Sequence, residues 1–200
     1  PEGFCEQCNG KCCTEFTGYV THADVKRLVD HLKKPVDAFI TGYADDGKCT
    51  HPLIKLAEYD VRIGLSYVDK KCCLLNVVGD RRRCTVQSAK PMVCRTYPFS
   101  ISSEDKLVHV EPYKCPGPIW PPDQAGVDKS VSEVKQLKKE YKEYAALVDQ
   151  WNAQPKEKRA SLKAFLAFAY HALDGPMNAT LIKVPDWRLT TRLADKKGQK

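Results

Sequence analysis

The cysteines are the residues of this chain whose type and spacing could do chemistry. Four of them stand within nine positions, in the stretch CEQCNGKCC at residues 5–13. Thiolates are ligands of Zn²⁺ and of iron–sulfur clusters, whereas a pair of thiols can also form a disulfide. Neighbouring cysteines bridge each other poorly because the geometry is strained, and this chain has two such pairs, Cys12–Cys13 and Cys72–Cys73. The pattern therefore favours metal binding over a disulfide framework.

The spacing of the first cluster differs from the common short metal motifs. A zinc ribbon has two CxxC pairs, whereas this chain has one, Cys5–Cys8. A bacterial ferredoxin run would need a cysteine in place of Lys11, and the CxxxCxxC motif of radical S-adenosylmethionine enzymes would need one in place of Glu15. The residues alone leave zinc and iron–sulfur both open, and the number of clustered thiols favours iron–sulfur.

Charge is unevenly distributed along the 200 residues. Residues 1–128 hold 17 basic and 17 acidic side chains, whereas residues 129–200 hold 15 and 8, which accounts for the net charge of +7. In the stretch VKQLKKEYKEY lysines alternate with glutamates, as on a solvated helix with i,i+4 pairs. We therefore expect the helical extension to contact a protein partner rather than nucleic acid. No apolar run approaches the roughly 20 residues that cross a bilayer, and we expect a soluble, cytoplasmic protein.

The N-terminal part predicts short helices and strands. Thr21 can cap a helix, and its apolar face would hold Val25, Leu28, Val29 and Leu32. Pro35 predicts a second short helix that continues to about Tyr43. Strands are expected at residues 63–68, 73–77 and 83–86, with the turn VVGDR between the last two. The stretches YPFSISS and KLVHVEP, joined around EDK, predict a β-hairpin.

The C-terminal part predicts two helices. The first has one apolar stripe, formed by Val134, Leu137, Tyr141, Tyr144, Val148 and Trp151. Pro155 would open the second helix and Gly175 would close it. Its apolar face would hold Leu162, Phe165, Leu166, Ala169 and Leu173. The two should pack as an antiparallel hairpin.

These elements predict an α+β fold. An irregular, cysteine-ligated metal core with short antiparallel strands would be flanked by helices and followed by the helical hairpin. The expected division is a cysteine-cluster metal-binding domain at residues 1–117, a Pro/Gly-rich connection at 118–128, and a helical hairpin extension with a basic tail at 129–200.

The order of the cysteine motifs resembles the CxxCxxCC (YkgJ-like) cysteine-cluster family, over roughly residues 5–117. The resemblance is carried by CEQCNGKCC, CCLLN, CTVQSAKPMVCRTYPF and CPG. The family is described as zinc- or iron-chelating and, in some members, as iron–sulfur binding. It implies eight metal ligands, namely Cys5, Cys8, Cys12, Cys13, Cys72, Cys84, Cys94 and Cys115. Where the family has proline and phenylalanine after the fifth ligand, this chain has Cys73 and Leu74; either Cys72 or Cys73 could be that ligand, and we expect Cys72.

Four thiolates around Zn²⁺ or a [4Fe-4S]²⁺ cluster leave a net charge of about −2, which nearby cations should offset. Arg95 directly follows one implied ligand, and we expect it to contact the bound cofactor. Lys71 and residues 81–83 flank other ligands. Cys49 lies outside the family pattern, although the sequence CTH at residues 49–51 could form a mixed Cys/His ligand pair.

The resemblance implies an iron–sulfur protein, with one or two [4Fe-4S] clusters used for electron transfer, sensing or the stability of a complex. A structural zinc protein is the first alternative. The second is an accessory or catalytic part of a protein-modifying enzyme, because some relatives resemble flagellin lysine N-methylases. The sequence has no glycine-rich phosphate loop, HExxH or GxSxG motif, so nothing in it points to a nucleotide-dependent or hydrolytic enzyme.

Overall fold

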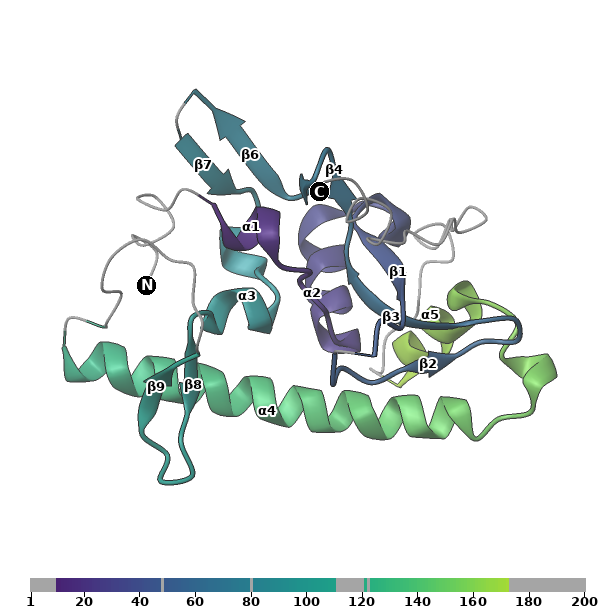
Figure 1. Ribbon diagram of the computed structural model, residues 1–200. Coiled ribbons are helices and arrows are strands. Elements are labelled where there is room, and N and C mark those ends of the chain that lie inside the picture. Colours follow the sequence, from purple (N-terminus) through teal and green to yellow (C-terminus); the bar gives the residue numbers. More distant parts are fainter. Residues whose placement is uncertain (1–9, 48, 80, 111–120, 122, 173–200) are drawn as a thin grey trace, which may run out of the picture.

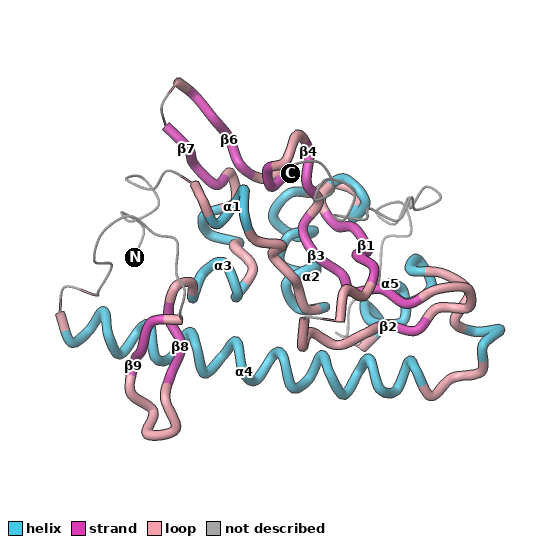
Figure 2. Tube along the Cα trace, in the orientation of Figure 1, coloured by secondary structure: helices cyan, strands magenta, loops and turns pink. Residues whose placement is uncertain are grey.

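The computed structural model describes residues 10–47, 49–79, 81–110, 121 and 123–172. Its helices and small antiparallel sheets confirm the α+β class (Figures 1 and 2). One long helix, α4 (Gln124–Asn152), runs across the lower part of Figure 1. Most of the shorter elements lie above it, and the hairpin at residues 99–109 crosses it and reaches below it. No helix within the described ranges has the length and apolar character that a membrane crossing requires.

A three-stranded antiparallel sheet lies at the centre of the core. Its order is β1 (Ile40–Ala44), β3 (Asp60–Leu65) and β2 (Ile54–Lys55). The middle strand β3, between its two neighbours, is buried from Val61 to Leu65. Its sequence alternates: Val61, Ile63 and Leu65 are at most 3% exposed on one face. On the other face the buried Arg62 donates to the His51 carbonyl and pairs with Asp45.

Helix α2 (His22–Leu32) packs its apolar face into this core, as the sequence predicts. Val25, Leu28 and Val29 are all at most 3% exposed. The predicted cap is also present: the Thr21 side chain accepts a hydrogen bond from the backbone N–H of Asp24, and the Asp24 carboxylate accepts one from the Thr21 N–H. This reciprocal capping box fixes the start of the helix.

Three two-stranded hairpins supply most of the remaining strands. They are β4 (Tyr67–Val68) with β5 (Lys71–Cys72), β6 (Leu75–Val78) with β7 (Arg81–Cys84), and β8 (Phe99–Ile101) with β9 (Leu107–His109). The predicted turn at VVGDR and the predicted hairpin around EDK are both confirmed. Figure 1 shows β6 and β7 projecting away from the rest of the molecule.

Helix α4 contacts α2, α3 (Met92–Thr96), β2 and the β8–β9 hairpin. Its C-terminal half belongs to the main core, whereas Val134 packs with the hairpin in a separate small cluster. Helix α5 (Leu162–His171) folds back onto the end of α4. The ring of Phe165 lies edge-on to Trp151, with 5.5 Å between ring centroids. Helix α4 begins at Gln124, within the segment 118–128 that the sequence predicts to be a connection. The predicted division of the chain into a metal-binding domain, a connection and a helical extension stays a prediction.

One helix prediction is wrong, and the predicted start of another is misplaced. The stretch from Pro35 to Tyr43 forms only a 3₁₀ turn, η1 (Val36–Ala38), and then strand β1, because β3 offers Ile40 and its neighbours a pairing partner. Likewise, Pro155 opens a 3₁₀ turn, η3 (Lys156–Lys158), and Ser161 caps the helix that follows. In both places a 3₁₀ turn follows the proline. The apolar face predicted for the last helix is confirmed, because Leu162, Phe165, Leu166 and Ala169 are all buried. The predicted closing residue Gly175 lies outside the described residues.

Candidate metal centre

Five cysteines from four separate elements line one cavity of about 430 Å³. Cys12 and Cys13 lie on helix α1 (Cys12–Glu15), and their sulfur atoms are 3.8 Å apart. The other three are Cys72 on β5, Cys84 at the end of β7 and Cys94 on α3. Residues up to 82 positions apart in the sequence thus meet at one site, while most of the remaining lining is apolar.

A glycine places the first two thiols. The backbone N–H of Cys13 donates to the Gly10 carbonyl over 2.9 Å, which starts the turn that becomes α1. Gly10 has φ +69°, and a Cβ there would lie 3.2 Å from Cδ of Arg82. The positive φ favours glycine, and any larger residue would also press on the stem of Arg82.

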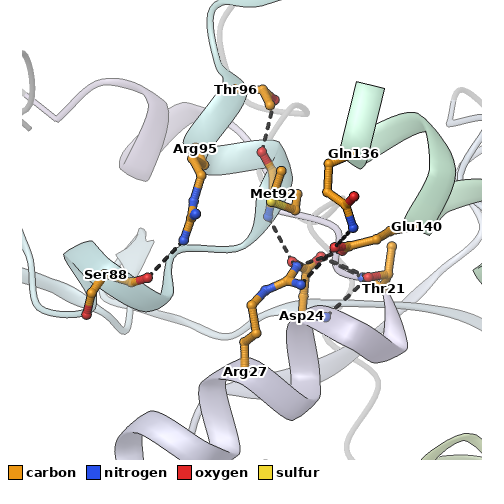
Figure 3. Close-up of polar contacts among 9 residues, drawn as sticks. All are labelled: Thr21, Asp24, Arg27, Ser88, Met92, Arg95, Thr96, Gln136 and Glu140. Carbon is orange, nitrogen blue, oxygen red and sulfur yellow. Dashed lines mark hydrogen bonds and ion pairs between the residues drawn. The ribbon is translucent and has the colours of Figure 1, made fainter. Parts of the chain in front are cut away.

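An acidic side chain places Cys94. Asp24, on α2 and 1% exposed, accepts a 2.8 Å hydrogen bond from the N–H of Met92, the first residue of α3 (Figure 3). The same carboxylate accepts from the backbone N–H and the hydroxyl of Thr21, over 3.0 and 3.1 Å. Helix α3 has only five residues, so this anchor fixes the position of its cysteine relative to α2.

Arg27 extends the anchor to α4. Its guanidinium donates to Asp24 and, through both terminal nitrogens, to the Glu140 carboxylate over 2.8 and 2.7 Å (Figure 3). Burial alone would raise the pKa of Glu140, but the hydrogen bonds from Arg27 and Gln136 outweigh it and lower that pKa. Burying the two carboxylates of Asp24 and Glu140 costs free energy, and the arginine that they share and the N–H donors offset that cost.

The thiols lie close enough to influence one another. Burial raises the pKa of Cys94 well above its usual value, and the neighbouring Cys72, Cys12 and Cys84 raise it further. In the absence of a positive charge, therefore, these thiols resist ionising together. A soft cation at their centre would reverse this balance, because it binds the thiolate form. Among the described residues no group of three His, Cys, Asp or Glu side chains already converges on the position of one ion.

The structure distinguishes the adjacent Cys72 and Cys73. Cys72 is buried and lines the cavity, whereas Cys73 is not among the lining residues and its thiol points to the Phe39 carbonyl, 3.8 Å away. A hydrogen bond between the two thiols raises the pKa of Cys72, with burial adding to it, and lowers that of Cys73. The geometry is that expected if Cys72 is the ligand.

Other predicted site residues are placed differently. Arg95 does not line the cavity; its guanidinium donates to the Ser88 carbonyl over 2.8 Å (Figure 3). The cations that do line the cavity within the described chain are Arg82 and Lys90. The alternation of residues along β7 is the signal that could have singled out Arg82. The remaining predicted ligands, Cys5, Cys8 and Cys115, lie outside the described residues.

Cys49 and His51 belong to a different, aromatic cluster and do not line the cavity. The backbone N–H of His51 donates to the Cys49 sulfur over 3.4 Å. The imidazole is 7% exposed and stacks on Tyr19, with 5.3 Å between ring centroids, and its nitrogens make no hydrogen bond of good geometry. Tyr141 and Tyr144 also contact the ring. Cys49 and His51 are therefore packed among aromatic side chains, away from the cavity.

This packing predicts sensitivity to mild acid. Burial, with a smaller contribution from the Arg62 charge, lowers the pKa of His51 from 6.5 to about 4. The unfolded chain therefore binds a proton that the folded chain excludes, and stability falls as pH drops from 6.5 towards 4. Between pH 7.5 and 5 this group should cost about 2 kcal/mol of the free energy of unfolding. Urea unfolding at both pH values should show that His51→Phe lacks this loss; an equal loss in wild type and variant would contradict the assignment.

The comparisons with known proteins agree with this picture. The family model CxxCxxCC, which describes a proposed zinc- or iron-chelating domain, matches residues 4–116. The match includes every cavity-lining cysteine. No solved structure matches the chain. Because the match covers more than half of the sequence and ends just beyond the last predicted ligand, the chain belongs to the CxxCxxCC family of proposed zinc- or iron-chelating domains.

Proposed function

We propose that this protein binds a [4Fe-4S] cluster through its cysteines and uses it for electron transfer, sensing or the stability of a larger complex. The observation that carries the proposal is the meeting of five thiols from α1, β5, β7 and α3 at one cavity. A structural zinc ion needs four ligands and little space. Five described thiols and a cavity of about 430 Å³ fit a polynuclear centre better.

Each part of the site would have a distinct task. Cys12, Cys13, Cys72, Cys84 and Cys94 would supply thiolates, and the apolar lining would limit the access of water. When bound, a cluster of this kind supplies one-electron transfer at a potential set by its charge, hydrogen bonds and solvent exposure. The Asp24 anchor of α3 would keep the thiol of Cys94 in place.

Analysis of the anaerobically purified protein tests this proposal. We expect a brown protein with broad absorption near 400 nm, containing iron and acid-labile sulfide in about equal amounts, roughly four of each per cluster. A colourless protein with stoichiometric zinc and no sulfide would instead establish the structural zinc alternative. Methyl transfer to a lysine substrate by the purified chain would assign it to the enzyme alternative.

A further inference from the structure

The β6–β7 hairpin presents its two faces to different surroundings. In its register, Leu75 pairs with Cys84 and Val77 pairs with Arg82, so these four side chains share one face. Leu75, Arg82 and Cys84 all line the cavity. Arg83 pairs with Asn76 on the opposite face and is not among the lining residues. Two consecutive arginines thus differ in whether they face the thiols.

The structure holds the stem of Arg82 at the cavity. Its Cβ and Cδ lie 3.4 and 3.2 Å from the position that a Cβ on Gly10 would take. A Cβ at Gly10 would contact this stem tightly, whereas glycine lets the arginine pack directly against the turn that begins α1. The stem of Arg82 thus lies beside the Gly10 turn that leads into Cys12 and Cys13, and the residue lines the cavity while remaining exposed to solvent.

A cation beside the cavity is needed because the site carries a negative charge once the thiolates hold a metal. Four thiolates around Zn²⁺ or a [4Fe-4S]²⁺ core carry a net charge of about −2 in a mostly apolar cavity. Arg95, adjacent to Cys94 in sequence, is engaged with the Ser88 carbonyl. Lys90 lines the cavity as a second cation, but Arg82 shares a strand face with a thiol ligand.

We propose that the positive charge of Arg82 offsets the negative charge of the thiolate-bound metal. Arg82 thereby strengthens metal binding and raises the reduction potential of a bound cluster. The effect on reduction potential rests on the proposed iron–sulfur function, whereas the effect on metal affinity does not depend on it. Removing the positive charge would destabilise a centre of net negative charge, and the more negative reduced state would lose more than the oxidised state.

The first test compares Zn²⁺ affinity, measured by competition with a chelator, in wild type and three variants. Arg82→Gln should weaken affinity about tenfold, at the lower end of the range for residues that surround a metal site, because the guanidinium is partly exposed. Arg82→Lys should restore most of the affinity, since it keeps the charge. Arg83→Gln is the matched control, one residue away on the other strand face, and should change little.

The second test is the reduction potential of protein reconstituted anaerobically with iron and sulfide. At a fixed applied potential, Arg82→Gln should shift the ratio of oxidised to reduced cluster about tenfold towards oxidised, a fall of about 59 mV in potential. Equal zinc affinities and equal potentials in the Arg82→Gln and Arg83→Gln variants would overturn the inference. Should wild type hold zinc alone, the iron–sulfur proposal fails, and the affinity comparison still decides the role of Arg82.

Discussion

Replacing Cys94 with serine should remove most of the bound metal and much of the soluble, folded protein. Serine keeps the size of the side chain but is a poor ligand for soft metals. Ligands from distant parts of the sequence meet only in the native state, so the free energy of metal binding is also folding free energy, about 10–16 kcal/mol for structural zinc in small domains. Metal content per chain and the far-ultraviolet circular dichroism of the purified variant measure both effects.

Cys49→Ser is the matched control for this variant. Cys49 is half-buried and lies in the aromatic cluster around His51, whose backbone N–H donates to its sulfur over 3.4 Å. Its substitution should therefore leave metal content unchanged. A set of variants in which Cys49 matters and Cys94 does not would contradict the whole assignment.

The same substitution distinguishes the other thiols. Cys72→Ser should reduce metal content more than Cys73→Ser, because only Cys72 lines the cavity. Serine at each remaining family cysteine should also lower metal content, and these are Cys5, Cys8, Cys12, Cys13, Cys84 and Cys115.

Replacing Asp24 with alanine should destabilise the protein by about 3–5 kcal/mol, the range for a buried ion pair that loses one partner. Met92, Thr21 and Arg27 would each lose an acceptor in a site that is 1% exposed. The start of α3 would no longer be tied to α2, so metal content should fall as well, although Asp24 does not line the cavity. Urea unfolding and metal analysis of the same preparation check the two effects.

Asp30→Ala provides the comparison on the same helix. Its carboxylate forms an exposed i,i+4 pair with Lys26 at 2.8 Å, and such pairs contribute under about 1 kcal/mol. Stability and metal content should both stay close to wild type. If Asp24→Ala were as mild as Asp30→Ala, the hydrogen-bonded link between α2 and α3 would not be what positions Cys94.

The sequence predicted local structure well where the signal was local. The cap at Thr21 and the apolar face of α2 depend on residues within one or two turns, and the β8–β9 hairpin depends on a short polar turn. The stretch after Pro35 differs from its local prediction because pairing with β3 determines its structure, and that pairing joins residues about 20 positions apart. A local pattern does not contain this information.

The same distinction applies to the candidate site. Cysteine spacing identified the thiols, five of which lie at one cavity, because ligand type is readable from single residues. Sequence proximity also suggested Arg95, since it follows Cys94, but the turn of α3 directs it to Ser88. Arg82 is brought to the cavity by hairpin register, and Asp24 reaches α3 across 68 positions. Tertiary structure, rather than sequence order, selects these supporting residues.

X-ray absorption spectroscopy at the metal edge of the anaerobically purified wild-type protein would identify the bound metal and the atoms around it. We expect iron with a first shell of sulfur alone, at about 2.3 Å as for other thiolate-bound metals, and a second shell that contains iron. A first shell of nitrogen or oxygen near 2.0–2.1 Å, without sulfur, would contradict this expectation, because the metal would then lie outside the cysteine cavity.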